Sequence, residues 1–484
     1  MSQKLVIDPV TRVEGHGKVT IHLDDDNKVK DAFFHIVEFR GFERFIQGHP
    51  YWEAPVLVQR LCGICPVSHH LAAAKAIDQI VGLNPEDLSI PAQKIRKLLH
   101  FGQVFQSHAL HFFYLASPDL LFGYDADPLK RNVVGVAMEY PELAKKGILM
   151  RKFGQEIIKL ITGKKIHGIS ATPGGVHKHI NAKEISYFMD GKEIPNINTM
   201  IEWSLEMIQF MKIYHENNKV FLDSFAAYPS GHLGLVNKKN GFLELYDGFL
   251  RATDSEGNIT LNDIPNEDYA NYFYEGVERW SYLKFPYLKH LGREKGWNRV
   301  GPLARMNICN GIETPFAEKE RLEFKSATAG KTNNMTMYTH WARLIEVLYC
   351  AEMMRNLLHD HDLLSNDLLR KGERRNRGIG IIEAPRGTLI HDYEVDDKDR
   401  ITHCNLIVST THNNEPMNQA VRWVANNVMD GRPEITEGML NQVEVAIRAY
   451  DPCLSCATHA MGQMPMEVSL YDAKGILIDE MIRS

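Results

Sequence analysis

Two pairs of cysteines near opposite ends of the chain have the spacing of metal ligands. Residues 60–69 contain one Cys-x-x-Cys pair followed by a histidine, and residues 451–459 contain a second pair followed by another histidine. This spacing lets one turn of backbone direct both sulfur atoms of a pair to the same point. We therefore predict a single four-thiolate site, which requires a fold that brings the two ends of the chain together. Its ligands are Cys62, Cys65, Cys453 and Cys456.

The spacing alone leaves three kinds of four-cysteine chemistry open. Zinc held by four thiolates is common, but zinc ribbons and fingers close short loops, whereas these two pairs lie far apart in the sequence. Iron–sulfur clusters also take four thiolates, although their usual sequence runs are more compact. Nothing typical of thioredoxin surrounds either pair. A soft-metal site is thus favoured over a redox pair, and the spacing does not choose the metal.

The composition is that of an ordinary globular protein. The chain has 484 residues, of which 44% are hydrophobic and 24% charged, with a net charge of -6 and no basic block. This argues against nucleic-acid binding. No apolar run approaches the roughly 18–20 residues that span a bilayer, and no apolar signal region follows Met1. We expect a cytoplasmic protein without membrane insertion, unless a partner carries an export signal. The seven cysteines, an odd number, do not suggest a disulfide framework.

Hydrophobic periodicity predicts an α+β fold that is mainly helical. Apolar residues recur at helical spacing after Pro91, from 201 to 211 and from 341 to 348. Such stripes are typical of the core of a long-helix bundle. We expect one domain over residues 1–459, followed by a C-terminal extension at 460–484.

Shorter alternating segments predict small sheets at the periphery of the bundle. Residues 18–39 read as a hairpin, and another strand pair turns at residues 254–258. Residues 378–395 read as one strand that returns through residues 401–408. The extension contains a further hairpin over residues 467–479.

The residues around both cysteine pairs resemble those of the large, catalytic subunit of nickel–iron hydrogenases. The first motif reads Arg-x-Cys-Gly-x-Cys-x-x-x-His and the second Asp-Pro-Cys-x-x-Cys-x-x-His. Further segments match the family in order: residues 11–16, 40–43, 167–176, 383–387 and 405–411. The soluble, bidirectional, NAD-reducing type is the most similar. The implied fold is one that the quinone-site subunit of respiratory complex I shares.

This resemblance implies a nickel ion bound by four thiolates, beside an iron ion that carries carbonyl and cyanide ligands. Cys62 and Cys453 would bind nickel alone, and Cys65 and Cys456 would bridge nickel to iron. Soft, polarizable thiolates suit both metals. The implied activity is the heterolytic cleavage or formation of dihydrogen.

Cleavage of dihydrogen needs a proton acceptor placed beside the metals. The family implies that the Cys453 thiolate takes the proton and that Glu14 relays it outward; a loop ion pair with Arg12 is the alternative role for Glu14. Arg386 matches an arginine whose guanidinium lies over the metal pair, where Asp451 would orient it. Taken alone, such an arginine is more often part of a surface ion pair. Whether it also acts as the base is left open by the sequence.

Other residues would surround the metals or bind a further ion. Pro385 and Thr410 match positions that line the cyanide pocket, and His69 matches a hydrogen-bond donor to a bridging sulfur, although a lone helical histidine is usually just packed or solvated. The resemblance also implies a magnesium ion held by Glu43 and His459, together with a backbone carbonyl near Leu406. Carboxylate and carbonyl suit magnesium better than imidazole does, so a plain histidine–glutamate hydrogen bond is the alternative.

The family's large subunits are made with a C-terminal extension that a dedicated endopeptidase removes. The implied cut lies between His459 and Ala460, and an attached extension would hold the site open until nickel arrives. A permanent C-terminal hairpin is the alternative interpretation of residues 460–484.

Electrons would leave through an iron–sulfur small subunit, which implies a tight interface with that partner. This chain has no Gly-x-Gly-x-x-Gly fingerprint after a strand, so NAD and flavin would be bound by separate diaphorase subunits. Three alternatives remain. These are an electron-bifurcating or deazaflavin-linked hydrogenase, a hydrogen-sensing regulatory hydrogenase, which generally lacks the extension, and a complex I-like subunit, which lacks the four cysteines.

Overall fold

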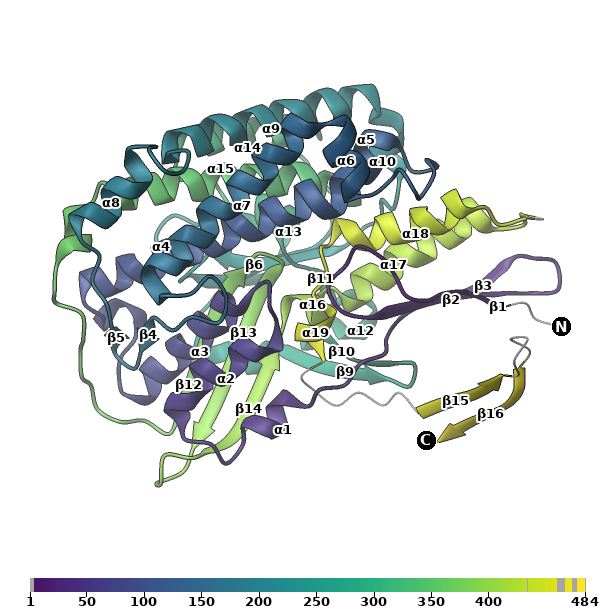
Figure 1. Cartoon of the computed structure of the whole chain (residues 1–484). Coiled ribbons are helices and arrows are strands. Elements are labelled where there is room, and N and C mark those ends of the chain that lie inside the picture. Colours follow the sequence, from purple (N-terminus) through teal and green to yellow (C-terminus); the bar gives the residue numbers. More distant parts are fainter. Residues whose placement is uncertain (1–3, 433, 459–465, 472–476, 484) are drawn as a thin grey trace.

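Long helices lie side by side along one side of the protein, at the top of the view in Figure 1. The computed structural model describes residues 4–432, 434–458, 466–471 and 477–483. The longest helices in this described part are α4 (Ile90–Leu110), α7 (Pro141–Thr162), α9 (Ile197–Asn217) and α15 (Thr339–Leu358). α4 packs against α7 and α15, and α15 also packs against α9. The predicted long-helix bundle is confirmed.

Proline and asparagine set the starts of several helices. Pro91 lies in the first turn of α4, where its missing amide hydrogen has no helical partner to lose. The side chain of Asn196 accepts the amide of Thr199 and so caps α9. The shorter helices include α3 (Pro66–Ile80), α5 (Ser117–Phe122), α6 (Val133–Glu139), α8 (Ala182–Met189), α10 (Lys219–Ser224), α13 (Pro302–Ile308), α14 (Pro315–Ser326), α17 (Asn414–Val424) and α18 (Glu437–Ala449).

Small, mostly antiparallel sheets surround the bundle. The N-terminal sheet has the order β1-β2-β3 (Lys4–Ile7, Gly17–Leu23, Val29–Ile36), which confirms the predicted first hairpin. A second has the order β11-β6-β7-β8 (Asn298–Arg299, Gly231–Val236, Phe249–Thr253, Ile259–Ile264). A third has the order β12-β13-β14 (Arg377–Ala384, Gly387–Val395, Ile401–Ile407). Two-stranded pairs are β4 with β5 (Ala171–Thr172, Gly175–Val176) and β9 with β10 (Phe273–Glu278, Ser281–Leu288).

A two-residue turn at Pro385 and Arg386 divides the segment that reads as one strand in the sequence. Ala384 pairs with Gly387 across this turn, so residues 378–395 form two antiparallel strands and the single-strand prediction is wrong. The physical reason is local: proline has no amide hydrogen for a strand ladder, and Gly387 has a φ of 129°, which favours glycine. The turn places Arg386 at the tip of the β12–β13 hairpin.

Two glycines allow this hairpin to lie directly on α3. A Cβ atom at Gly378 would be 1.8 Å from the carbonyl oxygen of Ala76, and one at Gly380 would be 1.9 Å from that of Ala72. No side chain fits at such distances, so strand β12 and helix α3 pack backbone against backbone. Because α3 begins directly after the first cysteine pair, this packing fixes that pair relative to the hairpin tip.

The two ends of the chain meet in the folded protein. The amide of Leu454 donates to the carbonyl oxygen of Glu14 at 2.9 Å, and the amide of Arg40 donates to that of Thr458 at 3.0 Å. The main hydrophobic cluster of buried residues extends from Ile7 to Ala457 and includes all four motif cysteines. The closure that the four-thiolate prediction requires is therefore present.

The C-terminal segment contains the predicted hairpin. Strand β15 (Met466–Tyr471) pairs antiparallel with β16 (Leu477–Arg483), and Figure 1 shows this pair apart from the helical body. The division into a domain of residues 1–459 and an extension of residues 460–484 remains a prediction. In the part of the chain that the structure describes, no helix is both long and apolar enough to cross a membrane.

Candidate metal centre

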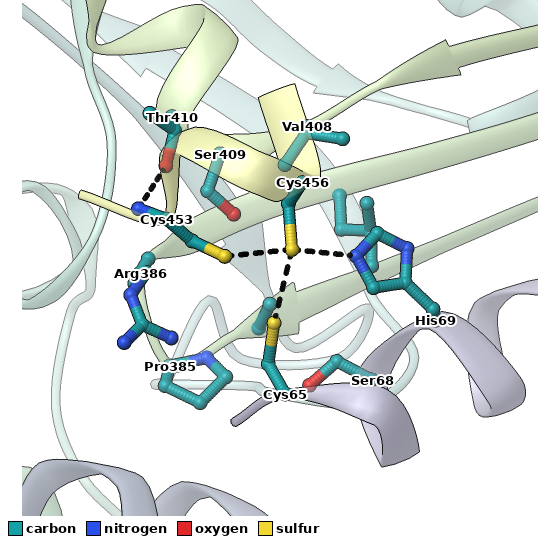
Figure 2. Close-up of a pocket in the computed structure, with 12 residues that line it drawn as sticks. Cys65, Ser68, His69, Pro385, Arg386, Val408, Ser409, Thr410, Cys453 and Cys456 are labelled. Carbon is teal, nitrogen blue, oxygen red and sulfur yellow. Dashed lines mark hydrogen bonds between the residues drawn. The ribbon is translucent and has the colours of Figure 1, made fainter. Parts of the chain in front are cut away.

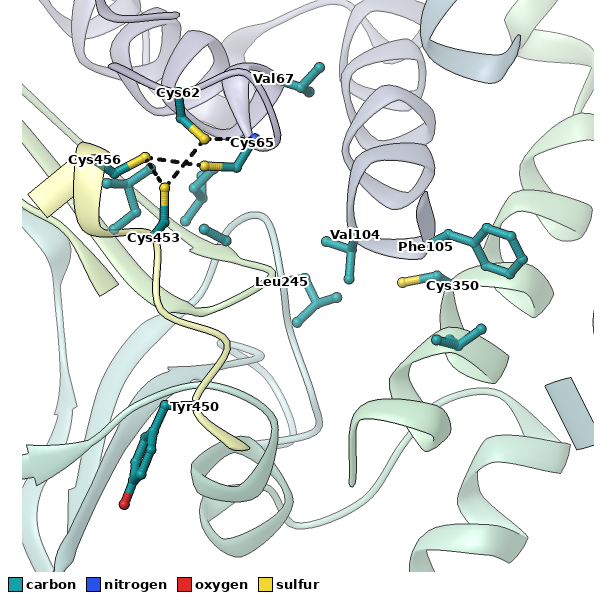
Figure 3. Close-up of a cluster of buried hydrophobic side chains, with 14 of the residues drawn as sticks. Cys62, Cys65, Val67, Val104, Phe105, Leu245, Cys350, Tyr450, Cys453 and Cys456 are labelled. Atoms are coloured by element: carbon teal, nitrogen blue, oxygen red, sulfur yellow. Dashed lines mark hydrogen bonds between the residues drawn. The ribbon is translucent and has the colours of Figure 1, made fainter. Parts of the chain in front are cut away.

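Four buried thiols converge at the junction of the two chain ends. The sulfur atoms all lie within 4.8 Å of one another. The Sγ–Sγ distances are 3.3 Å between Cys62 and Cys453, 3.4 Å between Cys65 and Cys456, and 2.7 Å between Cys453 and Cys456. All four cysteines are free thiols. Each half-site thus contacts the other, and Figure 3 shows the four sulfurs facing a common centre.

Short helical turns set the direction of these sulfurs. Cys65 precedes Pro66 as the N-cap of α3, and Cys453 is the N-cap of α19 (Leu454–Ala457), which also contains Cys456. The backbone amides of Ile64 and Cys65 point at the sulfur of Cys62, at 3.1 and 3.4 Å. Amide dipoles aimed at a sulfur stabilise negative charge on it, which is the form that binds metals.

The four thiols do not all ionise by themselves in this site. Hydrogen bonds from the neighbouring thiols, that of Cys453 first, lower the pKa of Cys62 well below the ordinary thiol value. Burial raises the pKa of Cys453 and of Cys456 well above it. Four adjacent thiolates in a buried site therefore require cations among them, which is the chemistry of a metal centre and not of a redox pair.

A small cavity lies beside the thiols (Figure 2). Its lining comes from the first cysteine pair and α3, the β12–β13 hairpin, the segment after β14 and the second cysteine pair. The lining residues are Cys65, Ser68, His69, Ala384, Pro385, Arg386, Leu389, Val408, Ser409, Thr410, Cys453 and Cys456. The predicted pocket residues Pro385 and Thr410 are thus among them.

Arg386 is a buried cation that Asp451 holds at this cavity. Its Nε donates to the carbonyl oxygen of Asp451, and its Nη2 donates to Oδ1 of the same residue at 3.0 Å. The left-handed φ of Asp451, 53°, turns carbonyl and carboxylate toward the same guanidinium. Burial acts to lower the pKa of Arg386, but Asp451 and the thiols, Cys453 first, raise it well above its ordinary value. Arg386 Nη1 is buried without a hydrogen-bond partner in the described part of the chain.

Glu14 contacts the thiol of Cys453, the group from which the family resemblance implies that it receives a proton. Oε2 of Glu14 accepts hydrogen bonds from Cys453 Sγ at 2.9 Å and from the amide of Ser455 at 3.1 Å. The guanidinium of Arg12 instead binds Asp119 Oδ1 at 2.6 Å. The structure therefore places Glu14 at the thiol cluster and pairs Arg12 elsewhere, against the alternative of a local ion pair.

Polar contacts also orient the second cysteine pair. Thr410 Oγ1 accepts the amide of Cys453 at 2.9 Å, and His69 Nε2 lies 3.3 Å from Cys456 Sγ. The other ring nitrogen of His69 is 3.2 Å from Nε2 of His391, whose Nδ1 is 2.7 Å from the hydroxyl of Tyr393. Sequence reasoning missed this His391–Tyr393 extension on β13, because no motif links these residues to residue 69.

The predicted magnesium ligands are only partly described. Oε1 of Glu43 accepts the backbone amide of Leu406 at 2.8 Å, and burial raises the pKa of Glu43 above its ordinary value. This contact uses the amide of Leu406, whereas the predicted magnesium ligand is a backbone carbonyl near Leu406. His459 lies outside the described residues, so the magnesium site stays a prediction.

The residues present fit a nickel–iron pair. Four soft sulfur donors suit such metals. The cavity beside them is bordered by Arg386, whose Nη1 has no hydrogen-bond partner in the described part of the chain and is available to an anionic ligand. A structural zinc ion would need the four thiols but neither this cavity nor the buried cation.

Comparison with known families gives the same class. Residues 40–131 and 251–459 match the family described as nickel-dependent hydrogenase, and residues 4–39 match one described as HoxL-like. The chain belongs to the nickel-dependent hydrogenase family.

Its similarity to characterised members extends over the full chain. It is 50% identical over 490 residues to the beta subunit of the NAD-reducing hydrogenase HoxS of Cupriavidus necator, with all of both chains covered. It is 43% identical over 480 residues to one subunit of the F420-non-reducing hydrogenase vhc of Methanococcus voltae, with 98% of each covered. A solved NAD+-reducing nickel–iron hydrogenase in the H2-reduced state has a TM-score of 0.91 at 51% identity, covering 94% of this chain and 99% of the other. The fold class expected from the sequence is therefore confirmed.

Proposed function

We propose that this chain is the catalytic large subunit of a nickel–iron hydrogenase that cleaves or forms dihydrogen and exchanges the electrons with NAD through partner subunits. One observation carries the proposal. Four buried thiols contact one another, and the same cluster contacts a carboxylate on one side and borders the Arg386 cavity on another. Full-length identity of 50% to the NAD-reducing relative supports the choice of acceptor.

The thiols would divide the metals between them. Cys62 and Cys453 would bind nickel alone, and Cys65 and Cys456 would bridge it to an iron that carries carbonyl and cyanide. When bound by these thiols, a nickel–iron pair would supply the Lewis acidity that favours heterolytic cleavage of dihydrogen. Pro385, together with Thr410 and Arg386, would surround the diatomic ligands in the cavity.

The chain's own residues would then remove the proton. Cys453 Sγ accepts it, and the 2.9 Å contact to Glu14 Oε2 provides the next acceptor. The amide of Ser455 holds that carboxylate oxygen in place at 3.1 Å. The raised pKa of Arg386 supports a role as a fixed cation and not as the base, because a guanidinium that keeps its proton cannot accept another.

Other parts of the proposal concern partners and processing. Iron–sulfur clusters of a small subunit would carry the electrons, and diaphorase subunits would bind flavin and NAD. Magnesium at Glu43 and His459, an endopeptidase cut after His459 and a location in the cytoplasm complete the proposal. A second candidate is a subunit of an electron-bifurcating or deazaflavin-linked complex with another acceptor. Relatives at 43% identity are named F420-non-reducing hydrogenases, which favours an acceptor other than NAD but, because F420 is a deazaflavin, disfavours the deazaflavin-linked form. Hydrogen-dependent reduction of NAD+ by the purified complex distinguishes the two.

Metal analysis and infrared spectroscopy of the complex, purified anaerobically with its native partners, test the metal site. We expect nickel and iron in near-equal amounts, with sharp bands of metal-bound carbonyl and cyanide. Cys453→Ser should abolish hydrogen turnover. Cys350→Ser is the matched control, because Cys350 is also fully buried but lies on α15, away from the four thiols (Figure 3). Zinc without carbonyl bands, or near-normal turnover in Cys453→Ser, would contradict the proposal.

A further inference from the structure

A second buried arginine, Arg305 on α13, has every donor of its guanidinium engaged. A guanidinium carries five N–H groups in a planar fork. Nε and Nη2 of Arg305 each donate to the carboxylate of Glu346, both at 2.6 Å. Nη1 donates to Glu383 Oε2 at 2.7 Å. The remaining N–H groups donate to backbone carbonyls, so that no part of this fork is left for solvent, and the side chain is fully buried.

The backbone contacts of Arg305 are with the two residues that precede Arg386. Nη1 donates to the carbonyl oxygen of Ala384 at 3.0 Å, and Nη2 donates to that of Pro385 at 3.1 Å. Ala384 is the last residue of β12 to pair with β13, opposite Gly387, and Pro385 lies in the turn that follows. The planar guanidinium of Arg305 therefore holds the carbonyl oxygens of Ala384 and Pro385 at the same time.

The acceptors of Arg305 are themselves fixed by other elements. Glu346 belongs to α15, and its Oε2 is also 2.8 Å from Nε2 of His108 on α4. Glu383 Oε1 accepts the hydroxyl of Thr388 at 2.7 Å and the amide of Leu235 at 3.1 Å. The hairpin tip is thus tied through Arg305 to the two central helices of the bundle.

Arg386 is consequently held at both ends. Asp451 binds its guanidinium, whereas Arg305 binds the turn from which its side chain projects. The backbone of Arg386 also packs tightly, since a Cβ atom at Gly301 would be 2.8 Å from its carbonyl oxygen. Asp451 lies on the segment that carries the second cysteine pair, whereas the turn belongs to the β12–β13 hairpin. A shift of the turn relative to that segment would therefore move the guanidinium along the cavity wall.

We propose that Arg305 is a positioning residue for the metal centre: by binding the carbonyls of Ala384 and Pro385 it sets where the Arg386 guanidinium lies over the cavity beside the four thiols. The inference rests on the proposed function, because it concerns the same site. Arg305 does not border the cavity and does not touch the thiols; it acts through the turn.

The experiment replaces Arg305 with lysine in the complete complex. Lysine keeps the positive charge but has a single nitrogen, which cannot reach Glu346, Glu383 and both carbonyls together. The carbonyl and cyanide infrared bands of the metal site report the position of Arg386, and Arg386→Lys gives the reference shift. We expect Arg305→Lys to shift the cyanide bands in the same direction as Arg386→Lys. We also expect kcat to fall by about 10- to 100-fold with the KM for hydrogen unchanged, as for a small misplacement of a catalytic group.

Arg96→Lys is the matched control for a general loss of stability. Arg96 is equally buried, on α4, and its fork binds Asp78 and the carbonyl oxygens of Thr172 and Gly175, away from the hairpin tip. Both lysine variants should lower the melting temperature, but Arg96→Lys should leave the bands and kcat at their wild-type values. Unshifted bands in Arg305→Lys, or equal losses of kcat in both variants, would overturn the inference.

A milder variant covers the case in which Arg305→Lys fails to fold or to bind metal. Glu346→Gln keeps the shape of the acceptor but removes the charge that anchors the fork, so we expect a smaller shift of the cyanide bands in the same direction. Unshifted bands in that variant would also overturn the inference. Absence of carbonyl and cyanide bands in the wild-type complex is a different result, because it would overturn the proposed function itself.

Discussion

Cys453 and Glu14 are 439 residues apart in the sequence and lie in direct contact in the folded chain. Cys453 Sγ donates to Glu14 Oε2 at 2.9 Å, and the next amide, that of Leu454, donates to the carbonyl oxygen of Glu14 at 2.9 Å. One short bridge of backbone thus closes the fold and also sets a thiol against a carboxylate. The same contact joins the segment around residue 14 to the segment that carries the second cysteine pair.

Removal of the Glu14 carboxylate should stop proton transfer without disturbing the metals. For Glu14→Gln, we expect the exchange of dihydrogen with deuterons of the solvent to fall by about 10²- to 10⁴-fold. The side-chain amide of glutamine cannot accept and release the proton as the carboxylate does. The carbonyl and cyanide infrared bands should be retained. Glu38→Gln is the control, since that carboxylate binds His16 on the same N-terminal segment. Normal exchange in Glu14→Gln would mean that protons leave by another route.

Gly15 permits the close approach of the two chain ends. Its φ is +85°, and an added Cβ would lie 2.8 Å from both the Leu454 Cβ and the Ser455 amide nitrogen. We expect Gly15→Ala to lower the free energy of unfolding by about 1–3 kcal/mol and to slow hydrogen–deuterium exchange, because the Glu14 loop must move. Gly48→Ala isolates the backbone cost, as Gly48 has a φ of +88° with no atom within 4 Å of an added Cβ. Equal losses in urea unfolding would argue against a steric role for Gly15.

The hydroxyl of Thr410 satisfies the buried amide of Cys453 at 2.9 Å. Thr410→Val keeps the volume but leaves that amide without its acceptor, at a cost of about 1–3 kcal/mol in the free energy of unfolding. We also expect less nickel per chain, because the Cys453 backbone is no longer held in place. Thr410→Ser restores the acceptor and should recover most of both losses. A valine variant with wild-type stability and nickel content would show that this hydrogen bond is dispensable.

Buried neutral histidines should make the folded state sensitive to acid. Burial lowers the pKa of His70 from 6.5 to about 4, while its ring binds the carbonyl of Pro55 and the amides of Ser170 and Ala171. Between pH 6.5 and 4, His70 binds a proton in the unfolded chain but not in the folded chain. The free energy of unfolding therefore falls as the pH drops toward 4. One such group contributes about 1.4 kcal/mol per pH unit over that window.

His70→Gln tests this pH dependence. The variant should lose stability near neutral pH, where the neutral ring is well matched to its partners. Its free energy of unfolding should then decline less steeply between pH 6.5 and 4, by the equivalent of about one proton. Urea unfolding at several pH values gives both quantities. An unchanged slope would show that another group dominates the acid sensitivity, with His100 and His108 as candidates because burial also lowers their pKa to about 4.

Local sequence was enough to predict the four cysteines that meet in the fold and several of their neighbours. A Cys-x-x-Cys pair aims two sulfurs through a single backbone turn, so its capacity to bind a soft metal can be predicted from a few residues. The long helices were equally predictable, because apolar periodicity over many turns reports one buried face. The motif match also identified Glu14, Arg386 and Asp451 as residues that meet at the site.

Other features required the folded chain, because their partners are distant in sequence. The hairpin tip at Pro385 and Arg386 is an exception, because Pro385 and Gly387 are local turn signals, although the residues on both sides of them read as one strand. Whether Glu14 pairs with Arg12 or contacts Cys453 could not be predicted from the sequence, because Asp119, which binds Arg12 in the folded chain, is distant from it in sequence. Arg305 carried no signal at all, since its role arises from carboxylates and carbonyls that α15 and the β12–β13 hairpin bring to one fork. A hydrogen bond has a direction and a length that only tertiary packing sets, whereas ligand type and spacing are properties of the sequence itself.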